Sequence, residues 1–139
     1  MDIPEDSMLQ AVARRLAEIL RIQDWDITVK AVTGYELNKK TGEECTSCGV
    51  SDRYIRLNQA DIYLNKEAND DWYEVLVHEM LHIQSVSLEH CAEAYFDGRH
   101  SYFTDIYENL TDKQAQIFVK IYPLARLEKE GVINGKESN

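Results

Sequence analysis

Hydrophobic positions near the start of the chain recur with the period of an α-helix. The apolar residues of this segment are Leu9, Val12, Ala13, Leu16, Ile19 and Leu20. Steps of three and four residues place their side chains on one face of a helix, with charged residues on the other. The pattern therefore predicts an amphipathic helix that packs on a core, with Asp6 or Ser7 as its N-cap.

After this helix the pattern changes to that of a β-strand. Apolar and polar residues alternate strictly from Trp25 to Ala31, which is typical of a strand with one buried face. The strand has room to continue as far as Leu37. Residues 38–51 are polar and contain two glycines, which indicates a loop.

Two further strands are expected in the middle of the chain. The first spans 53–57 and the second 61–64. Asn58 and Gln59 lie between them and predict either a bulge or a tight connection. These strands complete a small sheet, either mixed or antiparallel.

The segment from 69 to 86 predicts a buried helix. Polar residues at 69–71 suit an N-cap and a first turn. The apolar residues at helical spacing are Trp72, Val75, Leu76, Met80 and Ile83. Val77 and Leu81 fill more of the circumference, so this helix is apolar nearly all round and is expected to be covered on most sides.

The pattern beyond this helix is less regular. Residues 87–100 are polar, with a turn signal at 97–99. A helix is expected within 102–122, although a capping box that begins at Thr111 also allows two helices that meet near Asn109. The apolar face of this stretch consists of Phe103, Ile106, Tyr107, Leu110, Ile117, Phe118 and Ile121.

The chain is expected to end in a short helix and a frayed tail. Pro123 weakens any continuation of the preceding helix, so Leu124 and Leu127 are assigned to a helix of their own. Residues 131–139 are predicted to fray. Helix, strands and then helices define an α+β fold, with a small sheet packed against helices, and 139 residues fit one domain over 1–139.

Composition narrows the class of protein. Hydrophobic residues make up 44% of the chain, which is enough for a core without a disulfide scaffold. The formal net charge is −10, and such a surface repels nucleic acid and anionic membranes. No apolar run is long enough to span a membrane. The start of the chain lacks the apolar stretch of a signal peptide, so a cytoplasmic location is expected.

Three cysteines, an odd number, fit a reducing compartment. Cys45 and Cys48 form a C-x-x-C pair, for which two thiols in a hairpin loop are the simplest interpretation. A local disulfide, or a second metal site that includes Cys91 or a nearby histidine, is the alternative.

The strongest chemical signal is the sequence H-E-x-x-H at 78–82. On a helix, His78 and His82 lie on one face about one turn apart, so both imidazoles can bind one Zn²⁺. Glu79 then lies beside the open position of the metal, where it can accept a proton from water. Two histidines and a glutamate in a buried helix are also costly unless something satisfies them, and a metal ion is the simplest candidate.

A catalytic Zn²⁺ usually has a third protein ligand. The long metzincin motif requires a glycine at position 85 and a histidine at position 88, where this chain has Ser85 and Leu88. If the helix continued, His90 would lie about 12 Å beyond His82 along its axis. Glu89 and Glu93 would be out of reach for the same reason, unless the helix ends near residue 86.

The third ligand is therefore expected after the chain turns back, beyond Gly98. The main candidates are His100, Asp105 and Glu108. The residues themselves leave the choice among these three open, and His90 remains an alternative if the helix ends near residue 86.

A resemblance favours one candidate. The stretch 74–82, preceded by 60–65 and followed by 107–110, resembles the minimal gluzincin-type metallopeptidase domains that phages and mobile elements often encode. The similarity covers residues 53–118 in the order of elements, and its one sharp motif is H-E-x-x-H.

The resemblance implies a fold and a set of site residues. In such domains a strand precedes the motif helix, and a later helix supplies a glutamate ligand. Carried over to this chain, His78, His82 and Glu108 bind Zn²⁺ and Glu79 is the general base. The long histidine-containing segment between His82 and Glu108 departs from that pattern.

The function expected from these features is hydrolysis of a peptide or amide bond in a peptide or protein substrate. Tyr107, Tyr102 and His100 are candidate donors to the developing oxyanion. The strand Ala60–Leu64 is a candidate edge for an extended peptide. The alternative is a catalytically silent zinc-binding interaction or regulatory domain, and a third hypothesis, an acidic partner-binding or nucleic-acid-mimicking protein, rests on charge alone. The sequence does not indicate an oligomeric state.

Overall fold

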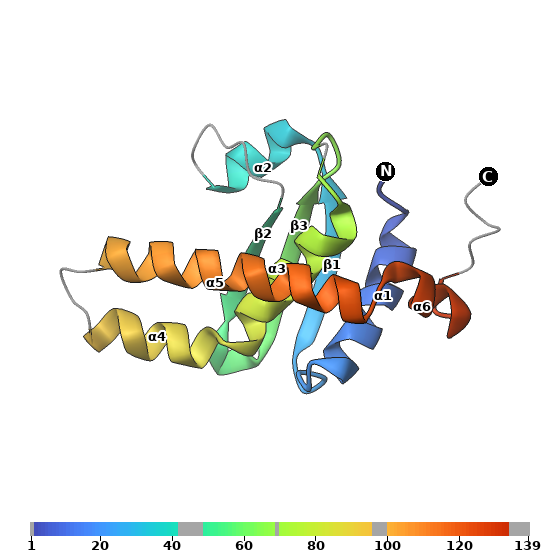
Figure 1. The fold of residues 1–139 in the computed structure, drawn as a ribbon. Coiled ribbons are helices and arrows are strands. Elements are labelled where there is room, and N and C mark those ends of the chain that lie inside the picture. The colour runs from blue at the N-terminus through green and yellow to red at the C-terminus, as the bar shows by residue number, and fades with distance from the viewer. Residues whose placement is uncertain (1, 42–48, 69, 96–99, 134–139) are drawn as a thin grey trace.

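The computed structural model describes residues 2–41, 49–68, 70–95 and 100–133 (Figure 1). Its elements, in chain order, are α1 (Asp6–Ile19), β1 (Asp26–Val32), α2 (Gly34–Thr41), β2 (Gly49–Tyr54), the 3-10 helix η1 (Ile55–Leu57), β3 (Gln59–Asn65), α3 (Trp72–Gln84), α4 (Val86–Tyr95), α5 (His100–Ile121) and α6 (Leu124–Lys129). Helices packed against a small sheet confirm the α+β class. No helix within these ranges is long and apolar enough to cross a membrane.

The sheet is mixed, with the strand order β1-β3-β2. β1 runs parallel to β3, and β2 runs antiparallel to it. Because β3 is central, both of its edges are already paired. The expectation that Ala60–Leu64 offers a free edge to a peptide is therefore wrong, and the two edge strands are β1 and β2.

The connection between β2 and β3 differs from the expected one. The strand expected at 53–57 instead spans Gly49–Tyr54, and 55–57 form the 3-10 helix. Asn58 closes the turn in the left-handed region, with φ of 48°. Asparagine tolerates that conformation better than most residues, so the tight connection is the alternative that applies.

One face of the sheet carries the core. Ile27 lies opposite Ala60 and Val29 opposite Ile62, and all four side chains are buried. They pack with the apolar face of α1 and with α3 in a single cluster. In Figure 1, α3 lies between the sheet and α5, and the contacts of α3 with β2, β3 and α5 agree.

The amphipathic helix α1 is confirmed, but its expected cap is wrong. Glu5 is the N-cap and makes no side-chain capping bond. The Asp6 carboxylate instead accepts a hydrogen bond from the backbone N–H of Ala31 at 3.0 Å, and Gln10 bonds the backbone of Ile27 and Val29. Side chains of α1 thus satisfy the outer edge of β1.

Helix α2 replaces the expected continuation of the strand to Leu37 and part of the expected loop. The Thr33 side chain caps this helix: its hydroxyl accepts a hydrogen bond from the backbone N–H of Glu36 and donates one to the Glu36 carboxylate. Leu37 is buried on this helix rather than in a strand. The pair Cys45 and Cys48 lies outside the described residues.

The buried motif helix is confirmed as α3. Asp71 caps it by accepting a hydrogen bond from the backbone N–H of Tyr73 at 3.0 Å. The helix ends at Gln84, and the Ser85 hydroxyl donates to the carbonyl of Leu81. Residues 86–95 then form α4 rather than a polar loop, and the turn expected at 97–99 lies outside the described residues.

Helix α5 is continuous, so the alternative of two helices meeting near Asn109 is wrong. Thr111 does not cap a second helix, because its hydroxyl donates to the carbonyl of Tyr107 four residues earlier. The expected buried face is also partly wrong, since its members Ile106, Leu110, Ile117 and Ile121 are exposed. The inward side of α5 instead carries Tyr107, Thr111 and Ala115.

The end of the chain is more ordered than expected. The short helix with Leu124 and Leu127 is confirmed as α6. Ile133 is buried and belongs to the core cluster, so the expected frayed tail does not begin at residue 131. Residues 134–139 lie outside the described residues.

Candidate metal centre

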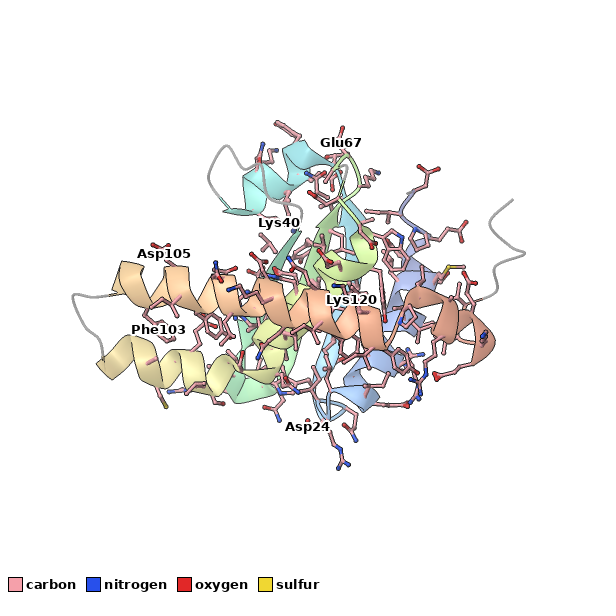
Figure 2. All side chains as sticks on the ribbon, in the orientation of Figure 1. Asp24, Lys40, Glu67, Phe103, Asp105 and Lys120 are labelled. Atoms are coloured by element: carbon pink, nitrogen blue, oxygen red, sulfur yellow. The ribbon has the colours of Figure 1, made fainter. Side chains whose placement is uncertain are left out.

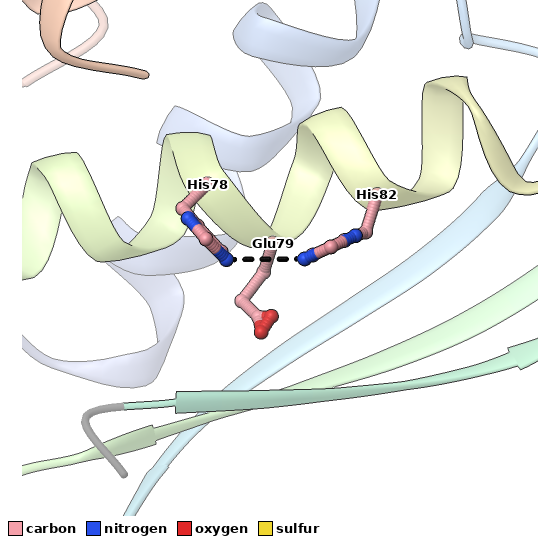
Figure 3. A group of neighbouring side chains, drawn as sticks. All are labelled: His78, Glu79 and His82. Carbon is pink, nitrogen blue, oxygen red and sulfur yellow. Dashed lines mark hydrogen bonds between the residues drawn. The ribbon is translucent and has the colours of Figure 1, made fainter. Parts of the chain in front are cut away.

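Helix α3 presents His78, Glu79 and His82 as one cluster. Potential ligand atoms of the three residues lie within 4.8 Å of one another. Figure 3 shows both imidazoles on one side of α3, with Glu79 between them and its carboxylate directed toward the sheet. The Nε2 atoms of His78 and His82 are 3.0 Å apart. The cluster has the arrangement of groups that can hold a metal ion.

Helix α5 brings a carboxylate to the same point. One oxygen of Glu108 lies 3.2 Å from Nε2 of His78, and the other lies 3.0 Å from Nε2 of His82. Ligand atoms around a tetrahedral Zn²⁺, each about 2.0–2.1 Å from the ion, are roughly 3.3 Å apart. Two nitrogens and a carboxylate at these separations are therefore close to the face of such a tetrahedron.

Asp112 supports His78 from behind, and the sequence analysis missed this residue. One of its carboxylate oxygens lies 2.8 Å from Nδ1 of His78. A carboxylate in that position fixes the orientation of a metal-binding imidazole and leaves Nε2 free to bind the ion. Asp112 follows Glu108 by four residues, so one face of α5 carries both. This spacing of four residues is the sequence feature from which Asp112 could have been predicted.

Two buried polar atoms of the cluster have no partner among the described residues. They are Oε2 of Glu79 and Nδ1 of His82, and the residues that carry them are only 7% and 4% exposed. Burial raises the pKa of the Glu79 carboxyl above its ordinary value, and the nearby histidines only partly offset this. An unpaired carboxylate here is costly to bury, and a bound cation with its water is a partner that would satisfy it.

The remaining charges of the cluster are strongly coupled. Hydrogen bonds to His78 and His82 hold the pKa of Glu108 well below its ordinary value. Burial tends to lower the pKa of His78, but its hydrogen bond to Glu108 and the charges of Glu79, Glu108 and Asp112 together raise it. Negative charge gathered around two imidazoles favours a cation at their centre.

The cluster opens into a cavity of about 570 Å³ between α3, α5 and β2. Its described lining is Gly49, Val50, Ser51, Arg53, Asp70, Glu74, Val75, His78, Glu79, His82, Glu108, Asp112 and Ala115. A Cβ at Gly49 would lie only 2.8 Å from a methyl of Val75, so glycine permits the close approach of β2 to α3.

The other candidates for a third ligand lie elsewhere. Asp105 is exposed and does not line the cavity, and in Figure 2 it projects from the side of α5 opposite α4, whereas Phe103 faces α4. His90 is exposed beside a smaller separate hollow. Glu89 forms an ion pair with Arg53 at 2.7 Å. The side chain of His100 lies outside the described residues.

Tyr107, one of the candidate oxyanion donors, does not line the cavity. Tyr107 is buried and its hydroxyl is hydrogen-bonded to Ser85, while its ring packs 5.1 Å from that of His82. The side chain of Tyr102 lies outside the described residues. Cys91 is exposed, with a free thiol. Among the described lining residues, the positively charged donor is Arg53.

Comparison with known proteins adds no family. No family model matches the chain, and neither a curated protein nor a solved structure gives a significant match. The class that the fold and cluster define is therefore an α+β protein with a possible metal-binding His-Glu-His group on a buried helix.

Proposed function

We propose that this chain is a zinc-dependent metallopeptidase. The observation that carries the proposal is the convergence of Glu108, from a different helix, on Nε2 of both motif histidines beside the unpartnered carboxylate of Glu79. A structural cluster would be expected to satisfy its own buried atoms. In a centre that holds an ion and a reacting water, such an atom gains its partner only when the ion and the water are bound.

The proposed ligands are His78, His82 and Glu108. Two imidazoles and one carboxylate form a ligand set that Zn²⁺ takes in catalytic sites, with a further position left for water. The exposed side chain of Glu108, 47% accessible, lies at the open side of the cluster. Solvent and a substrate can reach the centre from that side.

The proposed chemistry is peptide-bond hydrolysis. Bound Zn²⁺ would supply the acidity that ionises a water near neutral pH. Glu79 accepts the proton of that water while its oxygen forms a bond to the carbonyl carbon. Glu79 then delivers the proton to the nitrogen as the C–N bond breaks, so that one water is consumed and an amine and an acid leave. Burial raises the pKa of Glu79, which suits a group that both takes and returns a proton.

The position of the edge strand β2 favours a peptide as the substrate. Four of its residues line the cavity, and its inner edge pairs with β3, so its outer edge borders the site. An extended peptide can add to such an edge through main-chain hydrogen bonds. Arg53 on this strand is a candidate donor to the developing oxyanion, in place of Tyr107.

The test compares wild-type protein with Glu79→Gln, after loading both with zinc. Glutamine keeps the size of the side chain but is a poor base, so zinc content should be unchanged while hydrolysis of a peptide library falls by about 100-fold or more. Wild-type activity that persists in Glu79→Gln would contradict the role of Glu79. Full zinc occupancy with no turnover in the wild type would favour a catalytically silent zinc-binding domain instead.

A further inference from the structure

One end of the cavity carries negative charge that the proposed chemistry does not use. Glu74 precedes His78 by four residues and so lies on the same face of α3, one turn toward its N-terminus. Its side chain is half-buried and lines the cavity. Among the residues that the structure describes, it has no hydrogen-bond or ion-pair partner. Asp70 lines the same end.

The opposite end of the cavity does not offset this charge. Arg53 is the cationic residue of the described lining, and its guanidinium is already paired with Glu89 at 2.7 Å. Of the other acidic lining residues, Glu108 contacts both imidazoles, Asp112 lies against His78, and Glu79 belongs to the proposed metal centre. The charge of Glu74 is therefore left for a ligand.

A second observation indicates that this cavity receives a ligand and not only solvent. Glu79 is 93% covered, its Oε2 has no partner in the described chain, and it faces the same cavity. The two ends of the cavity can also be distinguished, because β2 runs alongside α3. Gly49 packs beside Val75 near the start of α3, whereas Arg53 contacts Glu89 beyond its end. A peptide lying along β2 would pass Glu74 on one side of the proposed scissile bond only.

We infer that the end of the cavity lined by Glu74 binds a cationic group of the substrate, either a lysine or an arginine side chain. This inference rests on the proposed function and names its substrate class: peptides with a basic residue on one side of the cleaved bond. A partly desolvated carboxylate attracts a cation more strongly than an exposed surface carboxylate does.

Glu74 also has an ordinary structural role from which the inference must be separated. It lies in the first turn of α3, where negative charge is favoured by the helix dipole. Loss of that role would lower the thermal stability of the protein and would affect all peptides alike. Loss of a binding site for a cation would instead change the relative affinities of the peptides.

The experiment measures two quantities with three peptides that differ at one position: lysine, methionine or glutamate. The first is kcat/KM with zinc-loaded wild type, with the variable residue moved in turn to each side of the cleaved bond. The second is the binding of the same fluorescent peptides to zinc-loaded Glu79→Gln. We expect a preference for lysine over methionine of about three- to tenfold at one position, shrinking at high salt.

Three variants identify the group responsible. Glu74→Gln should remove most of the preference, and Glu74→Lys should reverse it toward the glutamate peptide. Glu128→Gln, the same change on the exposed surface of α6, should retain it. Equal binding and turnover of the three peptides, or a lysine preference unchanged in Glu74→Gln, would overturn the inference. Absence of turnover with a retained lysine preference in binding would instead contradict the proposed function alone.

Discussion

Among the described residues, the cluster around Arg15 and the cluster around His78 differ in whether their polar atoms all find partners within the protein. In the first, Arg15 donates hydrogen bonds to Glu18, Glu130 and Tyr122, and the Tyr122 hydroxyl donates to Glu130. This network joins α1 to α6 and the end of α5, and its charges pair with one another.

The cluster between α3 and α5 is built from similar groups but is incomplete. Its histidines contact Glu108 and Asp112, yet Oε2 of Glu79 is buried without a partner in the described chain. The Arg15 network, whose groups pair with one another, is a closed network with the features of a structural contact between helices. The cluster on α3 is an open cluster: it has the features of a site that a ligand completes.

The largest expected effect comes from removing the carboxylate that closes the open cluster. Glu108→Ala leaves two imidazoles, so zinc affinity should fall by more than about 100-fold. The zinc-dependent rise in Tm should shrink with it, because linked binding energy is lost. Competition with a zinc chelator and thermal melting measure the two quantities.

Asp105→Ala is the matched control for that variant. Asp105 is a carboxylate of the same helix but is exposed and outside the cavity. Both variants should melt close to the wild type after chelator treatment. A Glu108→Ala protein that binds zinc as tightly as Asp105→Ala would remove Glu108 from the ligand set.

A smaller effect is expected at the residue behind His78. Asp112→Asn keeps a hydrogen-bond acceptor for Nδ1 but loses the charge that makes Nε2 a better ligand. Zinc affinity should fall by about 10- to 100-fold, with little change in the Tm of the zinc-free protein. Unchanged affinity in a chelator titration would show that Asp112 is an ordinary surface carboxylate.

The closed network should show the smallest effect and a different dependence on pH. Hydrogen bonds from Arg15 and Tyr122 lower the pKa of Glu130. A carboxyl whose pKa is lower in the folded state stabilises that state above its unfolded pKa, and this contribution fades as pH falls through the folded pKa. Glu130→Gln should therefore lower Tm slightly at pH 7, by a few degrees at most, and the difference should shrink toward pH 3. Zinc affinity should not change. A Tm difference that grows as pH falls would contradict this sign.

The sequence predicted the regular parts of the structure and the centre of the site. Helical and alternating periods identified α1, α3 and the sheet, because burial on one face of an element imposes those periods. The spacing of His78 and His82 similarly predicted one cluster, since both are fixed on the same helix. Local geometry was enough for these features.

The remaining features depend on contacts between distant elements. Ile106, Tyr107 and Ile117 were expected on one buried face of α5, but tertiary packing buries Tyr107 and leaves Ile106 and Ile117 exposed. Helix α2 was not predicted, although Thr33 and Glu36 have the T-x-x-E spacing that is typical of the start of a helix. The meeting of Glu108 with both imidazoles follows from how α5 crosses α3, which no local pattern specifies.

The most direct test of the central claim is X-ray absorption spectroscopy at the zinc edge on protein loaded with one equivalent of zinc. The account predicts a four-coordinate ion with nitrogen and oxygen neighbours at about 2.0–2.2 Å and imidazole scattering, and the same spectrum in a Cys91→Ser protein. Sulfur neighbours at about 2.3 Å would instead indicate a cysteine site. Such a result, or zinc that stays bound in full after His78→Ala, would contradict a metal centre on α3.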